Sequence, residues 1–100
     1  MSASIAIQIL PAVGTDAEVV RIVDEVIAYI QSTGLTHHVG PFETTIEGDS
    51  IDALMHVAKE CLHAATRAGA PKVSAYIKAV HRPEGDILTI DQKIGKYAQA

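Results

Sequence analysis

A carboxylate and a hydroxyl lie two residues apart near the middle of the chain. They belong to the stretch Gly40-Pro41-Phe42-Glu43-Thr44-Thr45-Ile46-Glu47-Gly48-Asp49, which is typical of a tight turn, a short polar strand and the start of a helix. On a strand, Thr45 and Glu47 point to one face, while Thr44 and Ile46 point to the other. Carboxylates are seldom buried without a partner, so Glu47 indicates either a binding site or a solvated strand end.

Two amphipathic helices flank this stretch and must hold it in place. The first is capped by Thr15, with Glu18 reaching back as in a capping box, and it ends at Gly34. The second begins at Asp49 or Ser50 and runs to about Ala68. Apolar residues at three- and four-residue steps form one stripe on each helix: Val19, Ile22, Val23, Val26, Ile27 and Ile30 on the first, and Ile51, Leu54, Met55, Ala58, Cys61, Leu62 and Ala65 on the second.

Four segments have the pattern of β-strands: residues 4–10, 36–39, 43–48 and 72–80. Residues 87–96 are mixed and predict a strand fragment followed by a turn of helix. The order β-α-β-β-α-β predicts an α+β, ferredoxin-like two-layer sandwich, with two helices on one face of a four-stranded antiparallel sheet. Right-handed crossovers place the first and third strands in the centre. Residues 1–100 therefore form a single ligand-binding domain with a short C-terminal extension.

Strand parity predicts a second sheet face that no helix covers. The isoleucines of the first strand face the helices, so the other face carries Ala6, Gln8, Leu10, Thr36, His38, Thr45, Glu47, Ser74, Tyr76 and Lys78. The two central strands would bring Gln8 beside Thr45 or Glu47. Small and polar side chains leave this face open, so we expect a homo-oligomer, a dimer or a tetramer, that closes it around a polar pocket.

Five residues of the open face are candidates for ligand binding: Gln8, His38, Thr45, Glu47 and Tyr76. Glu47 would supply a charge, and Tyr76 a ring that stacks on a flat ligand. Structural roles compete with each assignment. Lys78 could pair with Glu47 across the sheet, Thr45 could be a β-favoured residue, and Tyr76 could be a subunit contact. His37 points to the opposite face.

Composition excludes several other classes of function. The net charge of -4 and eight scattered basic residues disfavour nucleic acid, and no apolar run is long enough to span a membrane. The single Cys61 lies in an apolar stripe, which predicts a core thiol and a cytoplasmic protein without disulfides. His56, Glu60 and His63 share one side of a helix, a weak metal pattern, so we predict neither a metal nor a cofactor.

Three segments of the chain together resemble the thiamine-binding protein family, the UPF0045 group. They are Ile5-Ala6-Ile7-Gln8-Ile9-Leu10-Pro11, the Gly40-Pro41 turn with Thr44-Thr45-Ile46-Glu47-Gly48-Asp49, and Thr89-Ile90-Asp91-Gln92-Lys93-Ile94. The resemblance covers nearly the whole chain and implies a ferredoxin-like, cytoplasmic, oligomeric protein. It further implies binding of thiamine or a related pyrimidine without catalysis.

Two other functions remain open at this point. Ferredoxin-like dimers also include isomerases and cofactor-free monooxygenases, in which His38 and Glu47 would act as general base and acid. Alternatively, the open face is purely an oligomer interface, and the domain is structural.

Overall fold

The sheet of the computed structural model, which describes residues 1–98, has the predicted order and topology. The strands are β1 (Ala3–Pro11), β2 (Thr36–Val39), β3 (Thr44–Gly48) and β4 (Val73–His81), and the main helices are α1 (Asp16–Ser32) and α2 (Ile51–Arg67). All neighbouring strands are antiparallel, in the order β2-β3-β1-β4. The ferredoxin-like prediction and the central placement of β1 and β3 are therefore confirmed.

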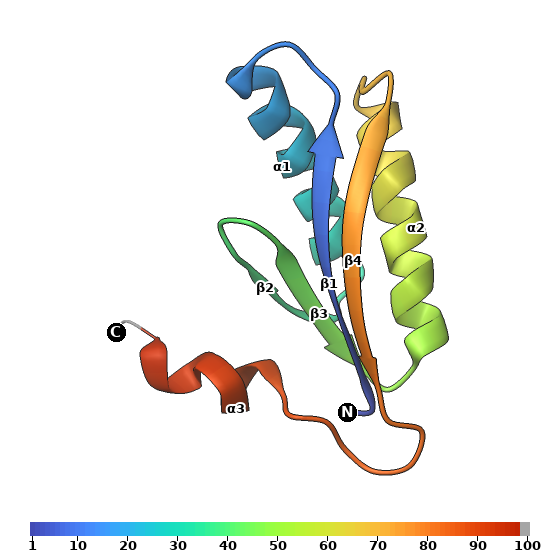
Figure 1. The fold of residues 1–100 in the computed structure, drawn as a ribbon, viewed down its shortest axis with the longest axis vertical. Helices are drawn as coiled ribbons and strands as arrows, with labels where there is room; N and C mark the ends of the chain where they lie inside the picture. Colours follow the sequence, from blue (N-terminus) through green and yellow to red (C-terminus); the bar gives the residue numbers. More distant parts are fainter. Residues whose placement is uncertain (99–100) are drawn as a thin grey trace.

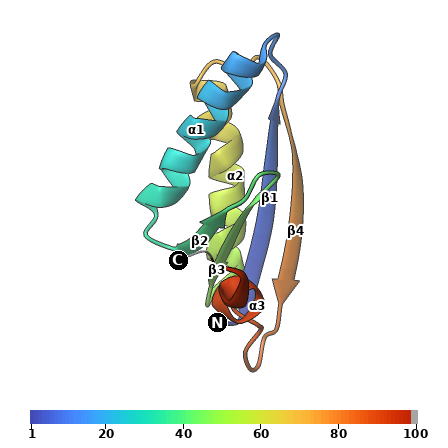
Figure 2. The ribbon, with the colours of Figure 1, turned by 90° about the vertical axis from the view of Figure 1, so that its left-hand side faces the viewer.

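Both main helices pack on one side of the sheet, as the two views show (Figures 1 and 2). The core between the two layers contains Ile5, Ile46, Ile22 and Leu54, which are all at most 1 % exposed. Burial of such side chains stabilises the fold by about 1.5 to 3 kcal/mol each. One predicted stripe needs a correction: Met55 is 41 % exposed, and Val57 is buried in its place.

The helix ends follow local chemistry, with one difference from the prediction. The Thr15 hydroxyl accepts a hydrogen bond from the Glu18 amide, and the Ser50 hydroxyl accepts one from Ala53. The Glu18 carboxylate does not complete a capping box, because it binds the Arg21 guanidinium at 2.9 Å. Gly34 follows α1 with a φ of 72°, a left-handed conformation that favours glycine.

The C-terminal segment extends away from the sandwich and places α3 (Ile90–Ile94) near the N-terminal end of β1 (Figures 1 and 2). A capping box between Thr89 and Gln92 begins this helix, and a 3₁₀ turn, η1 (Gly95–Tyr97), follows it. The predicted turn of helix is thus confirmed, whereas the predicted strand fragment is wrong. No helix among residues 1–98 is both long and apolar enough to cross a membrane.

Candidate functional site

The register of the sheet places all five predicted site residues on the face opposite α1 and α2. Thr45 lies opposite His38 on one side and Ala6 on the other, and Glu47 lies opposite Thr36 and Ser4. Residues directly opposite each other in an antiparallel pair point to the same face. His38, Thr45 and Glu47 therefore form one contiguous group at the β2–β3 half of the sheet.

Glu47 is the buried charged residue of this group. Its side chain is only 4 % exposed, and its Oε2 atom accepts a hydrogen bond of 2.8 Å from the backbone amide of Ile90. The donor is the first residue of α3, whose amide has no partner within its own helix. A segment 43 residues further along the chain thus satisfies part of the carboxylate. Within residues 1–98 this is the one hydrogen bond that Glu47 accepts, so its other oxygen retains its acceptor capacity.

Two adjoining cavities lie between α3 and this half of the sheet. The larger, about 540 Å³, is lined by Thr36, His38, Glu47 and by α3 residues that include Ile90 and Asp91. The smaller, about 350 Å³, is lined by His38, Thr45 and Glu43 together with Phe42 and Lys93. Their walls combine apolar side chains with a few polar groups, which is typical of sites for small molecules.

Gln8 and Tyr76 lie further along the open face, away from Glu47. They oppose each other across β1 and β4, whereas the position opposite Glu47 on β1 is Ser4. Four residues of strand separate Ser4 from Gln8, or about 13 Å. The expectation that Gln8 lies beside Glu47 is therefore wrong by register, whereas Gln8 is two residues from Ala6, the residue opposite Thr45, and so is a diagonal neighbour of Thr45. Tyr76 is 68 % exposed.

The predicted alternative partner of Glu47 is also wrong. The Lys78 ammonium binds Glu43, at 2.8 Å from Oε1, and not Glu47. Glu43 precedes β3 and lies on the same face as Thr45, so it reaches Lys78 across the small side chain of Ala6, which the register pairs with both Thr45 and Lys78. Glu43, a residue that the sequence reasoning missed, lines two cavities of the open face. Glu43, Thr45 and Glu47 are spaced by two residues, so on a strand their side chains point to one face. This spacing was the signal that could have identified Glu43.

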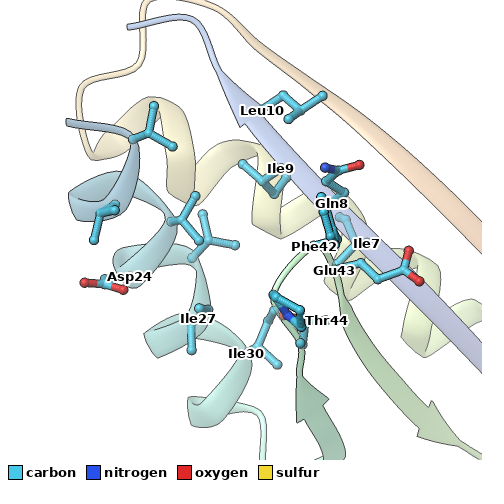
Figure 3. Close-up of a pocket in the computed structure, with 16 residues that line it drawn as sticks. Ile7, Gln8, Ile9, Leu10, Asp24, Ile27, Ile30, Phe42, Glu43 and Thr44 are labelled. Atoms are coloured by element: carbon cyan, nitrogen blue, oxygen red, sulfur yellow. The ribbon is translucent and has the colours of Figure 1, made fainter. Parts of the chain in front are cut away.

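A further cavity of about 340 Å³ lies on the helix side, beyond the end of the β2–β3 hairpin (Figure 3). Ile7, Ile9 and Ile27 form its apolar wall, and Phe42 and Glu43 lie at the turn that borders it. The turn is tight because the Gly40 amide donates to the Glu43 carbonyl at 3.0 Å. The stretch from Gly40 to Glu43 therefore borders cavities on both sides of the sheet.

The other histidine, glutamate and cysteine side chains considered in the sequence analysis lie outside the two cavities beneath α3. The Nδ1 atom of His37 lies 2.9 Å from the Leu35 carbonyl oxygen, away from the cavities. His56 and Glu60 approach to 4.0 Å on α2, and residues 1–98 contain no group of three or more side chains suited to a metal. Cys61 is fully buried, and burial raises the pKa of its thiol to about 11. As predicted, Cys61 is a core residue.

The fold places the chain among ferredoxin-like α+β proteins. Similarity to known proteins shows to which family within this fold class the chain belongs. The model of a family described as thiamine-binding protein matches residues 5–98. A UPF0045 protein from Clostridium perfringens is 40 % identical over 94 residues, which are 94 % of this chain and 95 % of that protein. A UPF0045 protein from Mycobacterium bovis is 36 % identical over 83 residues, which are 83 % of this chain and 79 % of that protein.

Solved structures agree with this assignment. A DUF77 domain from Bacillus cereus superposes with a TM-score of 0.84 at 35 % identity, covering 98 % of this chain and 91 % of that one. A Thermotoga maritima protein, for which a role in thiamine biosynthesis or salvage has been suggested, gives 0.82 at 28 % identity, with 98 % and 100 % covered. The chain belongs to the thiamine-binding protein family, with the UPF0045 and DUF77 proteins.

Proposed function

We propose that the protein binds thiamine or a related pyrimidine, without catalysis, on the open sheet face beneath α3. The buried carboxylate of Glu47 is the observation that carries this proposal. It lines a cavity of about 540 Å³, within the range of small-molecule sites, and has an oxygen available for a ligand. Membership of the thiamine-binding protein family supports this choice of ligand class.

The chemistry of the ligand complements the residues of the cavity. Thiamine carries a permanent positive charge on its thiazolium ring and an amino group on its pyrimidine ring. Glu47 would pair with either part through a charge-assisted hydrogen bond. His38 and Thr45 line the adjoining cavity, where a ring nitrogen and a hydroxyl can serve as donor or acceptor. The apolar side chains of Ile90 and Ile94 would cover the faces of a flat ring.

We further propose that the protein is a homo-oligomer, a dimer or a tetramer. On the β1–β4 half of the open face, Leu10, Tyr76 and Val80 are 40 to 68 % exposed. Within residues 1–98, no strand pairs with the outer edge of β4, which is nine residues long and contains no proline. Long uncovered edges of this kind pair readily with another strand. A second copy would close this half around Gln8 and Tyr76, which lie too far from Glu47 to share a small ligand within one copy.

Isothermal titration with thiamine and with hydroxymethylpyrimidine tests the binding proposal. We expect binding by the wild-type protein, and an affinity roughly ten- to hundredfold lower for Glu47→Gln, since a hydrogen bond to a charged group contributes about 1.5 to 3 kcal/mol. Glu60→Gln, which alters a carboxylate on α2, is the matched control and should bind like wild type. Absence of heat with both ligands at millimolar concentration would contradict the proposal.

Sedimentation at micromolar concentration tests the oligomer separately. We expect a dimer or a tetramer, and a shift towards monomer for Tyr76→Asp, which places a charge on the uncovered half of the sheet. A wild-type protein that sediments as a monomer under these conditions would contradict this part of the proposal.

A further inference from the structure

The C-terminal segment that follows β4 is attached to the sandwich by two backbone hydrogen bonds at its start and by a single polar contact further along the segment. At the base, the Arg82 amide donates to the Ser2 carbonyl at 2.8 Å, and the Ile87 amide donates to Met1 at 2.9 Å. After Ile87, the amide of Ile90 makes the one hydrogen bond between this segment and the rest of residues 1–98, and its acceptor is Glu47. Residues 88–98 are called the strap below.

The strap contributes nothing to the hydrophobic core. Neither α3 nor the 3₁₀ turn contains a buried residue, and no residue between 76 and 98 belongs to the core cluster or packs against it. Leu88 and Tyr97 are more than 60 % exposed. Because a five-residue helix is not stable alone in water, α3 depends on its attachment to the sheet. The strap can therefore open without unfolding the domain.

The attachment point is also a wall of the candidate site. The larger cavity is bounded by Glu47 on the sheet side and by Ile90, Asp91 and Ile94 on the strap side. A molecule in this cavity would touch both sides. It would reach one carboxylate oxygen of Glu47 while the Ile90 amide holds the other.

We infer that Glu47 is a latch: it holds the strap closed through the Ile90 amide, and a ligand in the cavity below strengthens this closure. The latch itself requires no ligand, whereas its coupling to binding rests on the proposed function. Ligand occupancy would then change the exposure of Leu88, Ile94 and Tyr97, the exposed large apolar side chains of the strap. Ligand binding in the cavity would thereby change the apolar surface that the protein exposes to other molecules.

A pair of substitutions at Ile90 isolates the latch. Ile90→Pro removes the amide donor, and proline is well tolerated at the first position of a helix. Thr89 already has the extended conformation that a following proline requires, with a φ of -77° and a ψ of 165°. Ile90→Ala removes the same apolar side chain but keeps the amide, so it is the matched control.

Hydrogen exchange at the amides of Gln92 and Lys93 measures the state of the strap, since both donate to Thr89 within α3. Without ligand, we expect exchange at least tenfold faster in Ile90→Pro than in Ile90→Ala, with unchanged exchange in β1 and α2. Equal rates in the two variants would overturn the latch.

Thiamine then tests the coupling in the wild-type protein. Slower exchange of the two strap amides at saturating thiamine supports it. Binding heat with unchanged exchange would overturn the coupling and leave the proposed function intact. Absence of heat would overturn the proposed function and, with it, the coupling, whereas the comparison of the two Ile90 variants would still decide the latch.

Discussion

The ammonium of Lys78 lies 2.8 Å from the carboxylate of Glu43 and so joins β4 to the residue preceding β3 across the central strand β1. The ion pair crosses the open face above Ala6, a residue small enough to leave the path clear. Glu43 lines the smaller cavity beneath α3, and both members of the pair line a second cavity over β1 and β4. This pair, rather than a pair with Glu47, leaves the Glu47 carboxylate free for the strap and a ligand.

The Glu43–Lys78 pair should contribute little to stability. The two side chains are 35 % and 70 % exposed, and exposed ion pairs contribute about 0.2 to 1 kcal/mol. A double-mutant cycle with Glu43→Gln and Lys78→Met, measured by urea unfolding, should give a coupling energy in this range that decreases in high salt. A coupling energy of several kcal/mol would show that the pair holds the sheet together, contrary to this account.

Gly40 should be intolerant of a side chain. A Cβ atom at this position would lie 2.8 Å from the Glu43 carbonyl oxygen, closer than real contacts allow. We expect Gly40→Ala to lower the free energy of unfolding by about 1 to 3 kcal/mol, since the turn must open. Gly14→Ala is the matched control, because no atom lies within 4 Å of a Cβ there, and it should be close to neutral. Equal losses in the two variants would refute the close approach.

Cys61 should make stability depend on pH in the alkaline range. Burial raises the pKa of the Cys61 thiol in the folded state to about 11, above its ordinary value of 9.0. The unfolded chain therefore loses the thiol proton first, and the stabilisation is present below pH 9 and is lost as the pH rises towards 11. Two pKa units correspond to about 2 to 3 kcal/mol.

Urea unfolding of wild type and Cys61→Ala between pH 8 and 11 checks this prediction. The difference in stability between the two proteins should shrink with rising pH, because alanine has no proton to lose. Burial, and after it the charge of the Cys61 thiolate, raise the pKa of Tyr29, so the comparison removes the part of the Tyr29 contribution that comes from burial and keeps the part that comes from Cys61. A constant difference across this range would contradict the assignment of a protonated, buried thiol.

The sequence predicted those features that depend on local periodicity. The isoleucines of β1 and the stripe of α1 determined which faces meet, and parity then placed His38, Thr45 and Glu47 on the open face. Register does not follow from strand periodicity: the pairing of β3 with β1 places Ser4, and not Gln8, opposite Glu47, and the pairing of β4 with β1 places Tyr76 opposite Gln8. Helical periodicity alone also gave a wrong prediction for Met55. This residue is exposed, because the buried face of α2 is centred on residues that include Val57 and Ala64.

The partner of Glu47 could not be predicted from local patterns. The capping box at Thr89 and Gln92 signals a helix start, but no local signal shows that the Ile90 amide meets a residue 43 positions earlier. That contact depends on how the chain turns after β4, where Gly85 has a φ of 109° and Asp86 binds the N-terminal amine. Tertiary geometry, rather than sequence period, thus completes the candidate site.

The most direct test of the central claim is a crystal structure of the protein grown with thiamine. We expect ligand density between α3 and the open sheet face, with a ligand nitrogen within hydrogen-bond distance of the Glu47 carboxylate and the Ile90 amide still bound to the other carboxylate oxygen. Density elsewhere, for example in the helix-side cavity between Ile9 and Phe42, or an empty face at saturating thiamine, would contradict it.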